Sequence, residues 1–300
     1  MIALKNAIKR LKFFVAKLTS SKRCYVTCTG MTDGAGAQVQ AVMSTQLFAH
    51  DMGMTYVHTP FNNIYYSHGR EDELEDYFGL GSGELQARTL PLETKKIKRL
   101  KWLFKSNVVY SIPHCHEYAD LYPHKYTLLK DGFRSKFLKN KQINDGRCDC
   151  LSIVTHIRRG DVSTSKHSER YTDIDKVNLI LSKVKKIAAS KGLVCKLTVV
   201  SQGRVEDFCD IDFDEVEFHL DTDLKDAFLD LTSADVLVMA KSSMSYCTAV
   251  YSNAVVMYER FWHTPLPDWI DIDQDDRLIE EIISKKYECG QKKVTQNENL

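Results

Sequence analysis

The chain lacks several features that would assign it to a functional class at once. Its formal net charge is only +1, so it has no overall excess of positive charge of the kind that favours nucleic acid. It contains no Walker loop, and no cysteine is followed by an arginine six residues later, as a phosphatase loop requires. It also has no internal repeat and no low-complexity segment. The 43% apolar and 27% charged residues are typical of a globular protein.

The chain has no apolar run that could span a membrane and no secretory signal. Residues 1–22 instead predict a basic amphipathic helix. One face carries only apolar side chains, and Lys and Arg occupy much of the rest; the apolar face comprises Leu4, Ala7, Ile8, Leu11, Val15 and Leu18. Two interpretations stay open: a helix lying on an anionic membrane surface, or a helix docked on the protein with its lysines in water. We expect a cytoplasmic location, with peripheral membrane contact through residues 1–22 under the first interpretation.

Nine cysteines form no compact framework. Cys24, Cys28, Cys195 and Cys247 lie in apolar runs and are expected to be buried thiols. The C-x-C pair at Cys148 is not the usual zinc spacing. A reducing compartment is the simpler interpretation, with a disulfide in a lumenal compartment as the alternative.

The order of apolar runs and turns predicts an α/β protein. "RCYVTCTG", "DGAGAQVQAVMSTQLFAHDMG" and "MTYVHTPF" read as strand, glycine turn plus helix, and strand, which is a βαβ unit with a parallel sheet. From residue 151, strands and helices alternate over about 110 residues, as in a doubly wound sheet. We therefore predict domains at 23–148 and 149–300, the second with a C-terminal helix, and a cleft between them.

Charge divides along the same boundary. Residues 1–150 hold 22 Lys and Arg against 14 Asp and Glu, whereas residues 151–300 hold 19 against 26. Formal charges of +8 and −7 fit two domains with different roles, although solvated faces would give the same split.

The stretch "LSIVTHIRRGD" places two adjacent arginines at the exit of an apolar strand. Ligands of doubly wound sheets bind at the carboxyl ends of the strands. The planar guanidinium group of arginine presents parallel N–H donors that can bind two oxygens of a phosphate. Arg158 and Arg159 are therefore predicted to bind a phosphate or pyrophosphate, with His156 on the same strand face as Arg158. The alternative is a structural ion pair with Asp161. The tripeptide RGD here abuts a buried strand, which disfavours an adhesion motif.

Three further polar clusters follow predicted strands. The loop "DGAGAQ" carries Gly34 and Gly36 before a helix, an arrangement that suits an anion or simply a tight turn. The second cluster is Ser201 to Arg204. The third, "KSSMSYC", offers serines that cap a helix or bind phosphate; they are Ser242, Ser243 and Ser245. Upstream, Asp226 and Asp235 are candidates to accept the N1 and N2 protons of guanine.

These stretches together resemble the GDP-fucose-dependent fucosyltransferase superfamily, which includes α-1,2-, α-1,6- and protein O-fucosyltransferases. "HIRRGD" is similar to its H-x-R-R-x-D motif, "DAFLDLTSADVLVMAKSSMSYCTAVYS" to its second motif, and "DGAGAQ" to its N-terminal glycine loop. The resemblance covers residues 30–50 and 150–260.

The resemblance implies a GT-B-like fold, two doubly wound Rossmann-like domains facing a central cleft. It implies an inverting, metal-independent glycosyltransferase that moves fucose from GDP-fucose to a hydroxyl of a glycan or another acceptor, with no cofactor. The C-terminal domain would hold the nucleotide. By motif position, Arg158 would hold the β-phosphate with Arg159 in support, and His156 would contact the nucleoside. Asp226, or less directly Asp235, would recognise guanine, while Ser242 and Ser243 would touch phosphate or ribose.

The general base is not evident from the residues. Asp33 and Asp161 are the leading candidates, with Glu169 and Asp173 close to the motif. The family often has Asn where this chain has Ala37. The H-x-H pair after "NVVYSI" lacks further ligands at helpful spacing, so we predict no metal site.

Three alternatives stay beside the leading hypothesis. One is a transferase for another GDP- or nucleotide-sugar, and another is a nucleotide-sugar-binding protein without transfer activity. The last is a different α/β enzyme that grips phosphate with the same arginines. No nucleic-acid partner is expected, and neither acceptor nor oligomeric state can be read from the sequence.

Overall fold

The structure is a computed structural model that describes residues 2–65, 67, 69–141, 150–272 and 279–280. The chain forms two compact units. Unit 1 comprises Met1–Gln142 with Trp262–Pro267, and unit 2 comprises Ile143–Phe261 with Asp268–Leu300. Residues 262–267, which the sequence assigned to the second domain, thus group with unit 1. The predicted boundary at 148/149, Cys148 and most of the predicted C-terminal helix lie outside the described residues.

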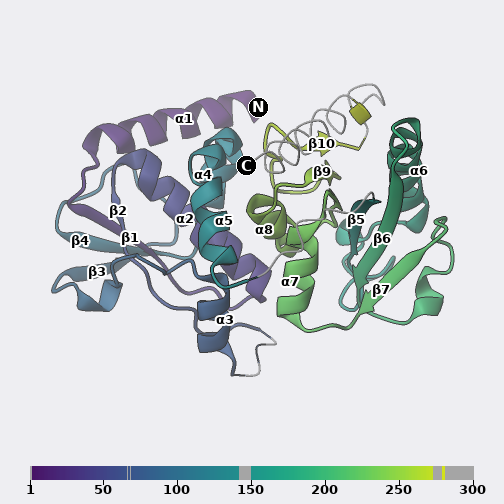
Figure 1. Cartoon of the computed structure of the whole chain (residues 1–300). Helices are drawn as coiled ribbons and strands as arrows, with labels where there is room; N and C mark the ends of the chain where they lie inside the picture. Colours follow the sequence, from purple (N-terminus) through teal and green to yellow (C-terminus); the bar gives the residue numbers. More distant parts are fainter. Residues whose placement is uncertain (1, 66, 68, 142–149, 273–278, 281–300) are drawn as a thin grey trace, which may run out of the picture. The chain divides into compact units, whose positions relative to one another are not determined.

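Unit 1 is a parallel sheet with helices packed on it (Figure 1). The strand order is β2-β1-β4-β3, and every pairing is parallel. Its elements are α1 (Ile2–Thr19), β1 (Cys24–Cys28), α2 (Ala35–Met52), β2 (Thr55–Tyr56), α3 (Glu71–Phe78), β3 (Glu93–Lys96), β4 (Val108–Ile112), α4 (His116–Leu121), α5 (Lys130–Leu138) and the 3₁₀ turns η1 (Ala87–Thr89) and η2 (Pro123–Leu128).

The helix α2 forms the centre of unit 1. Nearly all of its side chains are buried, as expected for a helix enclosed by a sheet and other helices rather than facing water on one side. It ends at Gly53, whose φ of 67° is the left-handed conformation that a glycine adopts without strain. The predicted βαβ unit over residues 24–56 is confirmed.

Unit 2 is a six-stranded parallel sheet with the order β10-β9-β8-β5-β6-β7. Its elements are β5 (Cys150–Ile157), α6 (Ile174–Ser190), β6 (Val194–Ser201), β7 (Val216–Leu220), α7 (Leu224–Ser233), β8 (Val236–Val238), α8 (Ser243–Tyr251), β9 (Val255–Tyr258), β10 (Ile270–Asp271) and the 3₁₀ turns η3 (Ser168–Arg170) and η4 (Val205–Phe208). Helix α6 covers one face, and α7 and α8 cover the other (Figure 1).

Counted from β5 in chain order, these strands run 3-2-1-4-5-6, the order of a Rossmann sheet. The core fills from both layers: α6 buries Val177, Leu181 and Val184 at helical spacing, and the sheet buries Ile153 and Leu197. The predicted α/β class with doubly wound, Rossmann-like parallel sheets is therefore confirmed.

Three local predictions need correction. The pattern of "RVEDFCDI" (204–211) predicts a helix, but the structure has only the short turn η4 there. The basic run from Lys95 predicts a solvated helix face, but it begins inside the edge strand β3. Cys195, expected to be buried with Cys24, Cys28 and Cys247, is partly exposed, because β6 starts near the surface.

Candidate functional site in unit 2

The predicted arginine pair lies where the strand order of unit 2 reverses. After β5 the chain passes to β6 and β7 on one side, and β8, β9 and β10 follow on the other side of β5. Helices that leave neighbouring strands in opposite directions open a crevice at the carboxyl ends of these strands, where ligands of such sheets bind. Arg158 is the first residue after β5, so the sequence motif sits at this switch point.

Arg158 and Asp161 form a two-pronged ion pair. The Nε of Arg158 donates to Oδ1 of Asp161 at 3.1 Å, and Nη2 donates to Oδ2 at 2.7 Å. These hydrogen bonds lower the pKa of the Asp161 carboxyl. A carboxylate engaged on both oxygens by a cation is a poor proton acceptor, so Asp161 orients Arg158 here. Within the described residues, Nη1 of Arg158 has no hydrogen-bond acceptor and keeps its donors for another group.

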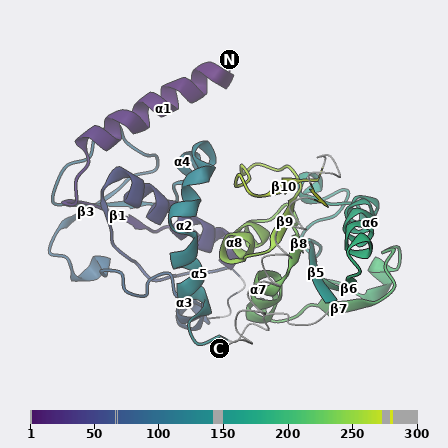
Figure 2. The ribbon, with the colours of Figure 1, turned by 45° about the horizontal axis from the view of Figure 1, so that its top comes forward.

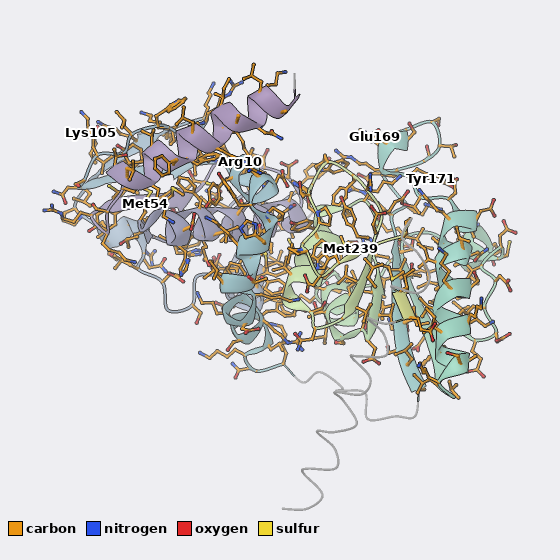
Figure 3. All side chains as sticks on the ribbon, turned by 90° about the horizontal axis from the view of Figure 1, so that it is seen from above. Arg10, Met54, Lys105, Glu169, Tyr171 and Met239 are labelled. Carbon is orange, nitrogen blue, oxygen red and sulfur yellow. The ribbon has the colours of Figure 1, made fainter. Side chains whose placement is uncertain are left out.

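Arg159, predicted to support the phosphate, instead donates hydrogen bonds to backbone carbonyls of its own loop. Its Nη1 donates to the carbonyl of Arg158 at 3.0 Å, and its Nη2 donates to the carbonyl of Thr172 at 3.2 Å. Its guanidinium lies 4.2 Å from the centre of the Tyr171 ring, and Tyr171 is labelled on the loop between β5 and α6 in Figure 3. Arg159 therefore closes this loop onto its own start, whereas Arg158 is not used in this way.

His156 is held in its neutral form. Burial, with a further contribution from the charge of Arg158, lowers its pKa to about 4. Its Nδ1 lies 2.6 Å from the Oγ of Ser245, which also accepts from the backbone N–H of Ala240 at 3.2 Å. Ser245 is fully buried, so Nδ1 is the acceptor that the described residues offer to its hydroxyl hydrogen. We infer that His156 carries its proton on Nε2 and can donate it.

The loop requires a glycine after the arginine pair. Gly160 has a φ of +75°, and a Cβ added there would lie 2.3 Å from Oε1 of Gln202. Gln202 follows β6, the strand that pairs with β5. The turn at Gly160 thus lets the loops after two neighbouring strands approach closely.

Glu259, which sequence reasoning missed, joins three elements at the same edge of the sheet. It follows β9 and is 7% exposed. Its Oε1 accepts from Lys176 at 2.8 Å and pairs with Lys241 at 3.1 Å, and its Oε2 accepts from the hydroxyl of Thr172 at 2.8 Å. Lys241 also donates to the carbonyl of Tyr171. The sequence did contain a signal for this role, since an acidic residue directly follows the apolar strand "AVVMY".

Burial alone would raise the pKa of Glu259, but hydrogen bonds from Lys176, Thr172 and Lys241 outweigh it and lower the pKa. Glu259 is therefore a buried carboxylate matched by donors rather than a candidate base. It fixes the end of the β5–α6 loop, whose beginning carries Arg158.

The serines after β8 divide into two roles. Ser242 caps α8 by accepting from the N–H of Met244 at 3.2 Å, as predicted for a helix start. Ser245 binds His156, as described above. Ser243 is the first residue of α8, the helix that follows β8, and β8 pairs with β5.

The two aspartates proposed for guanine lie at opposite edges of the sheet. Asp226 is exposed in the first turn of α7, which follows the carboxyl end of β7. Asp235 precedes β8, and its Oδ2 accepts from the N–H of Ser152 near the start of β5 at 3.0 Å. The structure does not bring Asp235 to the arginine pair, because the amino ends of β5 and β8 lie at the other edge.

Candidate residues of unit 1 lie at the start of α2. Asp33 is exposed, and its carbonyl accepts from Nε2 of Gln38 at 2.9 Å. Gly34 is the N-cap of α2, and Gly36 lies buried within its first turn. Gln38 also lines a small cavity of about 20 Å³, with Cys28, Gly30 and Phe61. Gln38 thus holds the loop beside a cavity with room for about one water molecule.

His114 and His116 belong to a cluster of imidazoles in unit 1. Their ring centres lie 4.4 Å apart, and His116 lies 5.0 Å from His263. Burial lowers the pKa of His116 well below its usual range, with the charges of His263 and His114 adding to the shift. Within residues 2–65, 67, 69–141, 150–272 and 279–280, no group of three or more histidine, cysteine or acidic side chains has a geometry that could hold a metal.

Comparisons with known proteins yield distant structural similarity alone. No protein-family profile matches the chain, and no curated protein does. The chain is similar to crystal structures of POFUT1 in complex with GDP, at 10% identity over 76% of this chain and 71% of that chain, with a TM-score of 0.25. A POFUT1 complex with GDP-fucose gives 11% identity over 77% and 72%, with a TM-score of 0.26. Values this low bear on neither activity nor substrate.

Proposed function

We propose that the chain is a glycosyltransferase that binds a nucleotide diphosphate sugar at the switch point of unit 2, with GDP-fucose as the donor. One observation carries the proposal: Arg158, oriented by Asp161, stands beside the neutral donor His156 at the carboxyl end of β5. The motif resemblance to fucosyltransferases and the strand order of unit 2 point to the same class of ligand.

The reaction would break the bond between the anomeric carbon of the sugar and the β-phosphate oxygen. A bond from that carbon to an acceptor hydroxyl would form, and the hydroxyl would lose its proton to a base. Negative charge grows on the β-phosphate as GDP leaves. A guanidinium already fixed by a carboxylate stabilises that charge without reorganising, so the step needs no metal ion. Attack from the face opposite the nucleotide would invert the anomeric configuration.

The remaining residues take supporting roles in this proposal. His156 would donate from Nε2 to the nucleoside, and Asp226 would accept from guanine. Ser243 and the N–H groups that begin α8 would meet phosphate or ribose. Asp33 is the candidate base that stays available, since Asp161 is engaged by Arg158.

Calorimetric titration with GDP, UDP, GDP-fucose and GDP-mannose, with and without EDTA, tests the donor. We expect GDP binding that survives EDTA and weakens at least about 10-fold in Arg158→Ala, because a hydrogen bond to a charged group is lost. Arg99→Ala, an exposed arginine of unit 1, is the control and should bind like wild type. Preference for UDP, or a strict need for Mg²⁺ or Mn²⁺, would refute the donor assignment.

Incubation of GDP-fucose with a panel of glycan and other hydroxyl acceptors tests transfer. We expect release of GDP together with a fucosylated product of inverted anomeric configuration, read by NMR. If GDP-fucose binds tightly but stays intact with every acceptor of the panel, the result would instead favour a binding protein without transfer activity. Ala37, which stands where the family often has Asn, fits that alternative. Asp33→Asn, compared with Asp161→Asn, then separates a base from a residue that orients Arg158: the first should lower kcat alone, and the second should also weaken GDP binding.

A further inference from the structure

The helix α1 has a broad apolar face that no other part of unit 1 covers. Five large apolar side chains on it are 50–70% exposed: Leu4, Ile8, Leu11, Phe14 and Leu18. At 100° per residue they fall within an arc of about 120°, which is the width of a face that would normally be buried. Figure 2 shows α1 along the outside of unit 1.

A different and smaller face attaches α1 to unit 1. Phe13 is 2% exposed and packs edge-on against Tyr118, with ring centres 5.0 Å apart, and Ala16 is fully buried. Lys9 and Lys12 pair with Glu117 of α4 on the same side. The sequence predicted either docking or a free apolar face; the helix has both, because the docking residues lie opposite the Leu4–Leu18 face.

Basic side chains border the exposed face on both sides. Arg10 and Lys17 lie along one margin, and Lys5 lies along the other, while Ile2–Thr19 contains no acidic residue. Lys17 pairs with Asp51 and still keeps 54% of its side chain exposed. An apolar stripe flanked by cations is the pattern of a helix that lies in the headgroup region of an anionic membrane.

A loop near the C-terminal end of α1 also exposes apolar side chains. Trp102 and Leu103 are 43% and 60% exposed, within a loop whose cations Lys98, Arg99, Lys101 and Lys105 are also exposed. The loop meets the chain just after α1, since the N–H of Asn107 donates to the carbonyl of Arg23 at 2.7 Å. Figure 3 labels Lys105 beside the C-terminal end of α1 and Arg10 along the helix. Tryptophan favours the membrane–water boundary.

We propose that α1 binds unit 1 to the surface of an anionic phospholipid bilayer, with the Trp102–Leu103 loop as a second contact. The helix would lie in the interface, because no helix of the described residues is long and apolar enough to cross a bilayer. A second copy of the chain fits less well. If the α1 helices of two copies packed face to face, their lysines and arginines would repel one another, because neither helix carries an acidic residue to pair with them. The proposal does not rest on sugar transfer.

Flotation of the full chain with phosphatidylcholine vesicles, with and without phosphatidylserine, tests the proposal. We expect wild type to float only with the anionic vesicles and less as salt is raised. Replacing Lys5 and Arg10 by Gln should weaken partitioning about 25-fold, at roughly fivefold for each charge. Replacing Leu4, Ile8 and Leu11 by Gln should abolish it while leaving the unfolding temperature unchanged, since these side chains are exposed.

The matched control is Leu179→Gln with Val194→Gln in unit 2. These side chains are 55% and 66% exposed, like those of α1, and should not affect flotation. The proposal fails if wild type floats equally with neutral vesicles or with none, or if the control weakens binding as much as the α1 variant. It also fails if sedimentation velocity shows that wild type is a dimer and the α1 variant a monomer, and wild type does not bind vesicles.

Discussion

Glu259 gives the sharpest test of how the site is held. Glu259→Gln keeps the shape of the side chain and removes the negative charge that faces the ammonium groups of Lys176 and Lys241. Breaking a buried ion pair by removing one partner costs about 3–5 kcal/mol. Lys176 is 41% exposed and recovers water, whereas Lys241 is 16% exposed and does not. We therefore expect a loss of about 2–3 kcal/mol in the free energy of unfolding.

Urea denaturation followed by circular dichroism measures this loss, and thermal unfolding should show a midpoint lower by about 5–10 °C. The control is Asp214→Asn, which removes a carboxylate that is 85% exposed and paired with Lys185 at 2.9 Å. An ion pair on the surface contributes little, so its effect should stay below about 0.5 kcal/mol. Equal effects of the two variants would contradict the role assigned to Glu259.

The pH dependence of stability provides a second test of the role of Glu259. The folded pKa of Glu259 lies below its unfolded value, so the stabilisation is complete above the unfolded pKa of 4.5 and is lost as pH falls through the folded value. The difference between wild type and Glu259→Gln should therefore shrink in acid. A difference that stays constant from neutral pH to well below 4.5 would mean that charge is not its cause.

Further predictions concern the residues around Arg158. Gly160→Ala should lower the free energy of unfolding by about 1–3 kcal/mol, because alanine is strained at the left-handed φ and its Cβ would meet Gln202. Adding Gln202→Ala should restore part of this loss, and urea titrations of the single and double variants would measure it. Ser245→Ala leaves Nδ1 of His156 without its hydrogen bond and should cost about 1–3 kcal/mol, whereas no loss would mean that this hydrogen bond does not stabilise the fold. Because the pKa of His156 falls from 6.5 to about 4 on folding, wild-type stability should decrease as pH drops from 6.5 to 4, and His156→Gln should show a flatter curve.

Much of the framework could be predicted from the sequence. The apolar runs of β1, β4, β5 and β6 each appear as parallel strands, since fully buried strands are apolar along their whole length. The edge strand β3, with the sequence ETKK, could not be found in this way because an edge strand needs no apolar pattern. Its place depends on pairing with β4, which no local signal encodes.

The site shows the same division. The arginine pair was found because it directly follows a strand, but both members were predicted to act on the phosphate, Arg158 directly and Arg159 in support. Only the fold shows that Arg159 binds Thr172 while Arg158 binds Asp161, because Thr172 is distant in sequence. The place of Asp235 could have been read earlier: it precedes "VLVMA", and a residue before a strand lies at the edge away from the ligand.

The short segment Trp262–Pro267 has a consequence for how the protein is made. It belongs to unit 1, where His263 is 6% exposed and its Nδ1 lies 3.1 Å from Oδ1 of Asp120. A ribosome releases residues 1–142 long before this segment emerges. Unit 1 must therefore wait until β5 to β9 of unit 2 have been synthesised before its last piece is in place, whereas β10 of unit 2 follows that piece. Five of the six strands of the second sheet can thus assemble while the first unit is still unfinished.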